Sequence, residues 1–168
     1  FNMQKPIIAA VNGLAMGGGF EVALACDIII AAENAFFALP EPRVGLAALA
    51  GGLHRLSRQI PMKQAMGMIL TGRRVMAAEG YELGFVTEVV PEGGALEGAR
   101  RWAELISECS PVSIRTSKDV VLRGQQYASA DEAIAANYQS VEDMRNSLDF
   151  IEGPLAFSEK RPPDWKGR

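Results

Sequence analysis

Short apolar runs alternate with glycine, proline and polar turns along the amino-terminal part of the chain. Ile7–Val11 is a β-branched and alanine-rich run that stops at Asn12-Gly13, the pattern of a buried strand entering a turn. Asp27–Ala32 contains three consecutive isoleucines, which favours a strand buried on both faces, and Phe36–Leu39 predicts a further short strand. A run of glycines precedes a helix that we predict over Val22–Cys26.

From Gly51 onward the apolar spacing is mainly helical. Glycine and proline separate the predicted helices, which are Leu53–Ile60, Lys63–Leu70, Ala77–Leu83, an amphipathic segment from Leu96 to Ile106 and another from Ile134 to Leu148. One more strand is predicted over Phe85–Val90. Strands that alternate with helices and then give way to helices indicate an α/β fold with helical additions.

Composition narrows the function classes. The 168 residues are 48% hydrophobic and 22% charged, which predicts a soluble domain with a sizeable core. A net charge of -3 provides no field suited to nucleic acid or an acidic membrane. Glu21 and Asp27 interrupt the most hydrophobic region, so we expect no membrane span. We expect Cys26 and Cys109 to be buried reduced thiols. Reduced thiols and the lack of a signal peptide at the start of the sequence together favour a cytoplasmic protein.

The start of the sequence suggests a missing segment. Because Phe1 stands just before a strand already under way, we expect sequence to be missing before it.

The single histidine limits hydrolytic and metal chemistry. A Ser-His-Asp triad or a histidine-rich metal site would have to use His54. Its spacing from Ser57 is one helical turn, but the neighbouring arginines favour an ordinary exposed helix face. The two distant cysteines lack metal-ligand spacing, so we predict no metal site.

The glycine run from Gly17 to Gly19 comes just before the predicted helix, and Glu21 follows the last glycine by two residues, where the helix begins. Unpaired N–H groups at such a helix start, together with the helix dipole, favour negative charge. A tight turn without a ligand explains the glycines equally well, and neither a phosphate-loop nor a dinucleotide-binding spacing is present. Glu21 in a first helical turn and Glu41 on a loop between prolines each have an ordinary structural explanation when taken alone.

Together these segments closely resemble the enoyl-CoA hydratase (crotonase) family over essentially the whole chain. The matching segments are Lys5–Gly13, Ala15–Glu21, Ala25–Ile28, Phe37–Glu41, Gly45–Leu46, Gly51–Gly52, Leu70–Arg74, Gly84–Val86, Val89–Pro91, Phe157–Arg161 and Trp165–Arg168. The resemblance implies a ClpP/crotonase-like ββα superhelix core over residues 1–92, lacking its amino-terminal portion. Residues 93–168 would then form a helical region for oligomerisation and for covering coenzyme A, with a homotrimer or a dimer of trimers as the assembly.

The resemblance also implies a role for individual residues. Glu21 and Glu41 match the two carboxylates that hold a water molecule in the family's hydratases, and Gly18 matches one oxyanion-hole amide, whose partner amide normally comes from the missing region. Phe157 and Lys160 match positions that contact the adenine and phosphate end of coenzyme A, often from a neighbouring subunit. The substrate is an acyl-CoA thioester, and no separate cofactor is expected because coenzyme A is part of it.

These residue types suit the hydration of a conjugated thioester. Water that adds to the β-carbon pushes charge onto the carbonyl oxygen, which preorganised N–H donors stabilise. One carboxylate takes a proton from the water while a protonated one donates to the α-carbon, and two neighbouring carboxyl groups disfavour double ionisation. The pairing of the two glutamates therefore predicts reversible addition of water to an enoyl-CoA.

Several alternatives stay open. The segment Glu152–Phe157 resembles carnitinyl-CoA dehydratase, and a double-bond isomerase is a weaker candidate because isomerases usually use one carboxylate. A non-catalytic acyl-CoA-binding or assembly subunit is a candidate from another class. The loop Leu46–Gly52 lacks the proline and extra glycine of many relatives, which leaves the acyl group unpredicted.

Overall fold

The computed structural model describes residues 3–168. They divide into two compact units, of which the first spans residues 7–103 and the second spans residues 104–168 together with residues 3–6. The division falls inside helix α5 (Ala95–Ser107). The predicted functional division after residue 92 stays a prediction.

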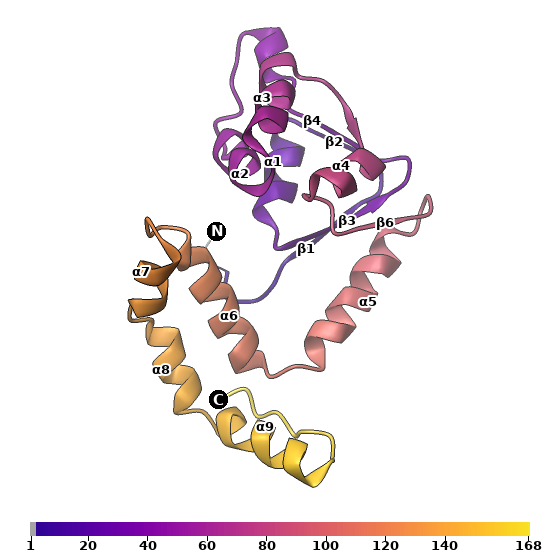
Figure 1. Cartoon of the computed structure of the whole chain (residues 1–168). Helices are drawn as coiled ribbons and strands as arrows, with labels where there is room; N and C mark the ends of the chain where they lie inside the picture. Colours follow the sequence, from indigo (N-terminus) through magenta and orange to yellow (C-terminus); the bar gives the residue numbers. More distant parts are fainter. Residues whose placement is uncertain (1–2) are drawn as a thin grey trace. The chain divides into compact units, whose positions relative to one another are not determined.

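The strands of the first unit form two small sheets. They are β1 (Ile8–Val11), β2 (Leu14–Met16), β3 (Ile28–Ala32), β4 (Phe36–Ala38), β5 (Val75–Met76) and β6 (Glu88–Val90). In one sheet β3 lies between β1 and β6 and is parallel to both (Figure 1). In the other, β4 pairs in parallel with β2 and antiparallel with β5. Parallel β-α-β connections of this kind confirm the predicted α/β class.

Helices fill the rest of the first unit. They are α1 (Gly18–Ala25), the 3₁₀ helix η1 (Glu41–Val44), α2 (Gly52–Gln59), α3 (Met62–Thr71), α4 (Ala77–Leu83) and most of α5. The helix predicted from Val22 instead begins at Gly18, because Gly17 makes the turn with a positive φ of 52° and the next two glycines lie in the first helical turn. The strand predicted from Phe85 begins only at Glu88, since the Phe85 amide donates to the Gly80 carbonyl and closes α4.

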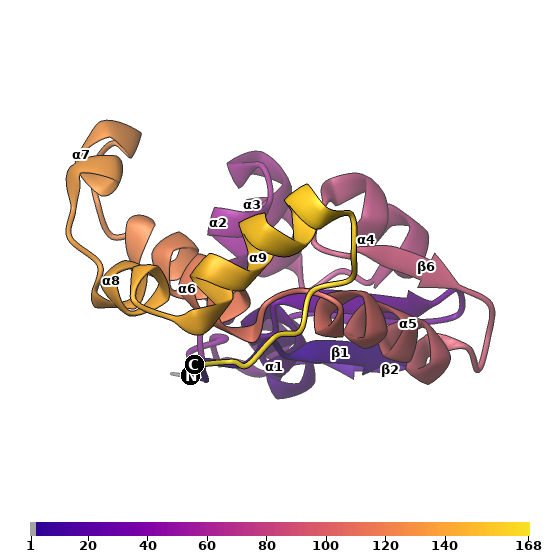
Figure 2. The same cartoon turned by 90° about the horizontal axis from the view of Figure 1, so that it is seen from below.

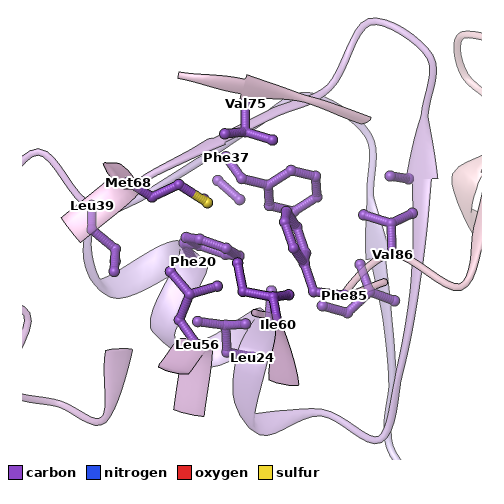
Figure 3. Close-up of a cluster of buried hydrophobic side chains, with 14 of the residues drawn as sticks. Phe20, Leu24, Phe37, Leu39, Leu56, Ile60, Met68, Val75, Phe85 and Val86 are labelled. Atoms are coloured by element: carbon purple, nitrogen blue, oxygen red, sulfur yellow. The ribbon is translucent and has the colours of Figure 1, made fainter. Parts of the chain in front are cut away.

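Three phenylalanines form the centre of the first unit's core. The ring centroids of Phe20, Phe37 and Phe85 lie 5.1–5.2 Å from one another, in tilted or edge-to-face arrangements (Figure 3). They come from α1, β4 and the segment after α4, and Leu56 and Met68 surround them with no solvent exposure. Because Phe20 lies directly before Glu21, this packing fixes the first turn of α1 to the sheet.

The second unit contains α6 (Pro111–Gly124), α7 (Ala130–Ala135), α8 (Gln139–Arg145) and α9 (Leu148–Glu159). The single helix predicted from Ile134 to Leu148 is wrong, because the chain is extended at Ala136, Tyr138 and Ser147. Tyr138 is buried and its hydroxyl donates to the Ala133 carbonyl, and Ser147 caps α9. The buried tyrosine and this cap therefore interrupt the helix, although the apolar spacing in the sequence continues through both positions.

The carboxyl-terminal tail has no regular structure but is firmly bound, and it runs back along α9 (Figure 2). The buried Asp149 carboxylate accepts hydrogen bonds from the Ser110 hydroxyl (2.7 Å) and from the amides of Lys166 (2.7 Å) and Gly167 (3.1 Å). Burial acts to raise the pKa of Asp149, but these hydrogen bonds outweigh it and leave the pKa below its usual value. Trp165 also donates to the Glu108 carbonyl at 2.8 Å.

The cysteines only partly match expectation. Neither forms a disulfide among the described residues, but Cys109 is exposed and Cys26 is half-buried. Cys109 lies two residues beyond the end of α5, in a bend that leaves its side chain exposed, so its predicted burial is wrong. Across residues 3–168, no helix has the length and apolar character needed to cross a bilayer.

Candidate active site

The candidate site forms where two neighbouring parallel strands end. β2 and β4 pair with Met16 opposite Ala38, so the segments that follow them leave the sheet at the same edge. The Gly17 amide donates to the Ala38 carbonyl at 3.0 Å, and this hydrogen bond holds the segment after β2 next to the end of β4. Helix α1 follows one strand, and η1, which begins at Glu41, follows the other. Parallel pairing thus brings residues distant in the sequence to one place.

Glu21 lies in the first turn of α1 with only 6% of its surface exposed. Its backbone amide donates to the Gly17 carbonyl, and its side-chain Oε1 accepts a 2.9 Å hydrogen bond from the Gly52 amide at the start of α2. The approach is close, because a β-carbon on Gly52 would lie 3.1 Å from that oxygen and 3.0 Å from the Ala48 side chain. The carboxylate is therefore buried, oriented and hydrogen-bonded through one oxygen.

Glu41 is the first residue of η1, which refines the predicted irregular loop into a 3₁₀ turn. Its Oε1 lies against the Gly17 turn, since a β-carbon on Gly17 would stand 3.0 Å from it. Its Oε2 is shielded from solvent and has no hydrogen-bond partner among residues 3–168. A buried carboxyl oxygen without a partner is costly, and such groups are often completed by a water molecule or a ligand.

Gly18 begins α1, where the first amides of a helix have no intrahelical acceptor. Within the described part of the chain, the Gly18 N–H group has no hydrogen-bond acceptor. The structure thus gathers Gly18, Glu21 and Glu41 around the same turn at Gly17. Sequence reasoning missed the contacts of Gly17 and Gly52 with these glutamates, although the Gly51-Gly52 pair was a visible signal.

Phe157 and Lys160 lie in the second unit, one helical turn apart at the end of α9. Phe157 is 88% exposed, and Lys160 ends the helix in a left-handed conformation with φ 55° and is exposed as well. The second unit also contains a cavity of about 310 Å³ between α6, α7 and α8. None of the predicted site residues lines this cavity.

The alternative chemistries receive no support from the described residues. His54 is exposed, and the Ser57 hydroxyl donates to the Leu53 carbonyl of its own helix at 2.7 Å, as an ordinary helical serine does. Residues 3–168 bring together no group of three or more His, Cys, Asp or Glu side chains with metal-binding geometry.

A family model described as enoyl-CoA hydratase/isomerase matches residues 1–168. The chain belongs to the enoyl-CoA hydratase/isomerase family. It is 42% identical over 174 residues to a carnitinyl-CoA dehydratase from Shigella flexneri, covering 100% of this chain and 66% of the relative. A carnitinyl-CoA dehydratase from Salmonella typhi matches at 42% over 176 residues with the same coverage. The chain therefore spans slightly less than two thirds of the length of these relatives.

Solved structures agree with this membership. An enoyl-CoA hydratase from Mycobacterium tuberculosis superposes with a TM-score of 0.93 at 39% identity, covering 98% of this chain and 65% of that one. An enoyl-CoA hydratase from Bacillus anthracis superposes with a TM-score of 0.93 at 40% identity, covering 99% of this chain and 64% of that one. The predicted crotonase fold is confirmed.

Proposed function

We propose that this chain carries the catalytic centre of a hydratase that adds water reversibly, in the syn sense, across the 2,3 double bond of an enoyl-CoA thioester. The observation that carries the proposal is that both carboxylates belong to the segments around the Gly17 turn: Glu41 Oε1 lies against this turn, and the buried Glu21 lies in the first turn of α1, which Gly17 precedes. Membership of the enoyl-CoA hydratase/isomerase family supports the same chemistry.

In this proposal the Gly18 amide donates to the thioester oxygen as negative charge develops on it. The first turn of α1 suits this role, because its amide has no acceptor in the described chain and the helix dipole favours an anion there. Removal of one such donor typically lowers the rate on the order of 100-fold or more.

In this proposal the two glutamates transfer the protons of the reaction. The Gly52 amide holds one oxygen of Glu21, which leaves the other for a water molecule, while the partnerless Oε2 of Glu41 needs a hydrogen bond that a water would provide. One carboxylate removes a proton from this water and the other, protonated, donates to the α-carbon. Water, thioester and two carboxyls are sufficient for this cycle, so it needs no cofactor apart from the coenzyme A of the substrate.

Phe157 and Lys160 would bind the adenine and phosphate end of coenzyme A. An aromatic ring that is 88% exposed is free to stack on a base, and an exposed lysine suits a phosphate. We further propose that the protein assembles as a homotrimer or a dimer of trimers and acts in the cytoplasm.

Carnitinyl-CoA dehydratase activity is the second candidate, and the 42% identity to relatives of that name favours it. Dehydration is the reverse of hydration and would use the same two carboxylates. A thioester panel separates the possibilities: fastest turnover of crotonyl-CoA supports the general hydratase, and fastest turnover of the carnitine-derived thioester supports the dehydratase. Movement of a double bond without water uptake would instead support an isomerase, and binding without turnover would support a non-catalytic acyl-CoA binder.

We expect Glu21→Gln and Glu41→Gln, made in the full-length protein, each to lower kcat for crotonyl-CoA hydration on the order of 100-fold or more, because each removes a proton-transfer group. Binding of coenzyme A, measured by calorimetry, should change little. Glu82→Gln is the matched control, since Glu82 is an exposed glutamate on α4. If either site variant turned over substrate at the wild-type rate, the role assigned to that glutamate would be wrong.

A further inference from the structure

The position of Glu41 depends on its backbone, because little holds its carboxylate directly. Oε2 has no hydrogen-bond partner among the described residues, and Oε1 lies against the Gly17 turn, where glycine offers no side chain. Any shift of η1 therefore moves the carboxylate by a similar amount. The contacts that fix η1 decide where this group stands.

Within the 3₁₀ turn, the Arg43 amide donates to the Pro40 carbonyl at 2.9 Å and the Leu46 amide donates to the Glu41 carbonyl at 3.0 Å. These bonds shape the turn but do not attach it to the rest of the unit. The attachment comes from the Arg43 side chain, whose Nε donates to the Thr71 carbonyl at 3.0 Å. Thr71 is the last residue of α3, far along the chain from Glu41.

The Thr71 carbonyl is a suitable acceptor for physical reasons. Carbonyls in the last turn of a helix lack intrahelical donors, and the helix dipole favours a cation there. The last turn of α3 contains no basic residue of its own, so Arg43 supplies the positive charge from η1. The guanidinium therefore joins the end of α3 to the segment that begins with Glu41.

Gly72 allows the two segments to lie this close. It ends α3 with φ 60°, and a β-carbon there would lie 3.0 Å from the Pro40 Cα and 3.2 Å from the Arg43 Nε. Such spacing is tighter than ordinary van der Waals contact, so a side chain at this position would push η1 away. Gly72 and Arg43 thus act on the same junction, one by leaving space and the other by a hydrogen bond.

We propose that Arg43 is a positioning residue that holds η1 against the end of α3 and thereby fixes the Glu41 carboxylate for proton transfer. This inference rests on the proposed hydratase function. It concerns geometry alone, because Arg43 is exposed and contributes little burial. Its loss should therefore affect the chemical step more than substrate binding or folding.

The test compares Arg43→Met and Arg43→Lys with the unchanged full-length protein in crotonyl-CoA hydration. Because sub-ångström displacement of a catalytic group lowers rates steeply, Arg43→Met should reduce kcat roughly tenfold with KM nearly unchanged. Arg43→Lys, whose ammonium can still donate to the Thr71 carbonyl, should recover part of the loss. Arg58→Met is the matched control, since the exposed Arg58 also donates to a backbone carbonyl, that of His54 in its own helix, and should keep the wild-type kcat.

A kcat within twofold of wild type for Arg43→Met, or a rise in KM at constant kcat, would overturn the positioning role. Glu41→Gln measured in parallel separates this result from a failure of the proposed function. If Glu41→Gln abolishes hydration and Arg43→Met does not, only the positioning role is lost. If Glu41→Gln hydrates crotonyl-CoA normally, the hydratase proposal itself is lost.

Discussion

At the scale of single residues, the candidate site depends on glycines that bring backbone against carboxylates. Gly52 offers its amide to Glu21 at 2.9 Å, and its missing side chain is what permits the approach. At Gly17 only the missing side chain matters: a β-carbon there would stand 3.0 Å from the Oε1 of Glu41, while the Gly17 amide donates to the Ala38 carbonyl. The Glu21 carboxylate is therefore oriented by main chain, which cannot change rotamer as a side-chain partner could, whereas the Glu41 carboxylate only packs against a glycine turn.

We expect Gly52→Ala to lower hydratase activity roughly tenfold or more, because the new β-carbon would displace the Glu21 carboxylate or shift α2. A contact of 3.0 Å to the Ala48 and Glu21 side chains also predicts a loss of stability of about 1–3 kcal/mol from overpacking. Steady-state kinetics and urea unfolding measure the two effects. Gly13→Ala serves as the control, because no atom lies within 4 Å of its added β-carbon; equal behaviour of the two variants would contradict the argument.

At the scale of elements, α9 and the tail are connected by ion pairs at the helix end. Arg161 binds both oxygens of Glu152 at 2.6 and 3.1 Å, and the Asp164 amide donates to the same carboxylate at 2.7 Å. The hydrogen bonds from Arg161, followed by that from the Asp164 amide, lower the pKa of Glu152 to about 2. The tail is thus coupled to the helix that carries Phe157 and Lys160.

This coupling predicts acid sensitivity of the second unit. Glu152 has a pKa of 4.5 when unperturbed and about 2 in the fold, so its contribution to stability is complete above pH 4.5 and is lost as the pH falls toward 2. Glu152→Gln should therefore lower the unfolding midpoint at neutral pH and flatten its decline in acid. Thermal melts across this pH range measure the effect, and a variant whose midpoint fell in acid as steeply as that of the wild type would contradict it.

Element prediction succeeded where a pattern was local and failed where packing decided the boundary. The helix over Ala77–Leu83 was predicted with its observed bounds, because glycine stops it and its apolar spacing is regular. The two-residue β5 and the three-residue β2 were missed, since runs this short exist only through their pairing with β4. The split of the predicted helix at Ile134–Leu148 likewise depends on the buried Tyr138.

At the scale of the whole molecule, α9 presents apolar side chains to solvent. The exposed ones on this helix are Leu148, Phe150, Ile151, Leu155 and Phe157. Leu148, Ile151 and Leu155 are spaced three and four residues apart, so they lie on one face of α9, and an exposed apolar face of this kind is characteristic of a contact surface. Under the proposed homotrimer, copies of the same chain would cover part of this face.

We expect Ile151→Glu to shift the protein toward smaller species, because Ile151 is 67% exposed on this face and a buried charge there would oppose assembly. Light scattering after size exclusion reports the mass. Gln126→Glu, which adds the same charge at another exposed position of the second unit, should leave the mass unchanged. An unchanged mass for Ile151→Glu would place the assembly surface elsewhere.

The sequence by itself determined the family, the α/β class and the residue types of the candidate site, because glycine turns, buried strands and helix stops depend on residues that are close together in the sequence. It could not determine how Glu21 and Glu41 are held. That required the parallel pairing of β2 with β4, which brings two distant segments to the Gly17 turn, and the approach of Gly52 to Glu21. Nor could it assign a role to Arg43, whose acceptor is a carbonyl at the end of another helix. Contacts between backbone groups far apart along the chain leave no local pattern, so only the tertiary structure decided them.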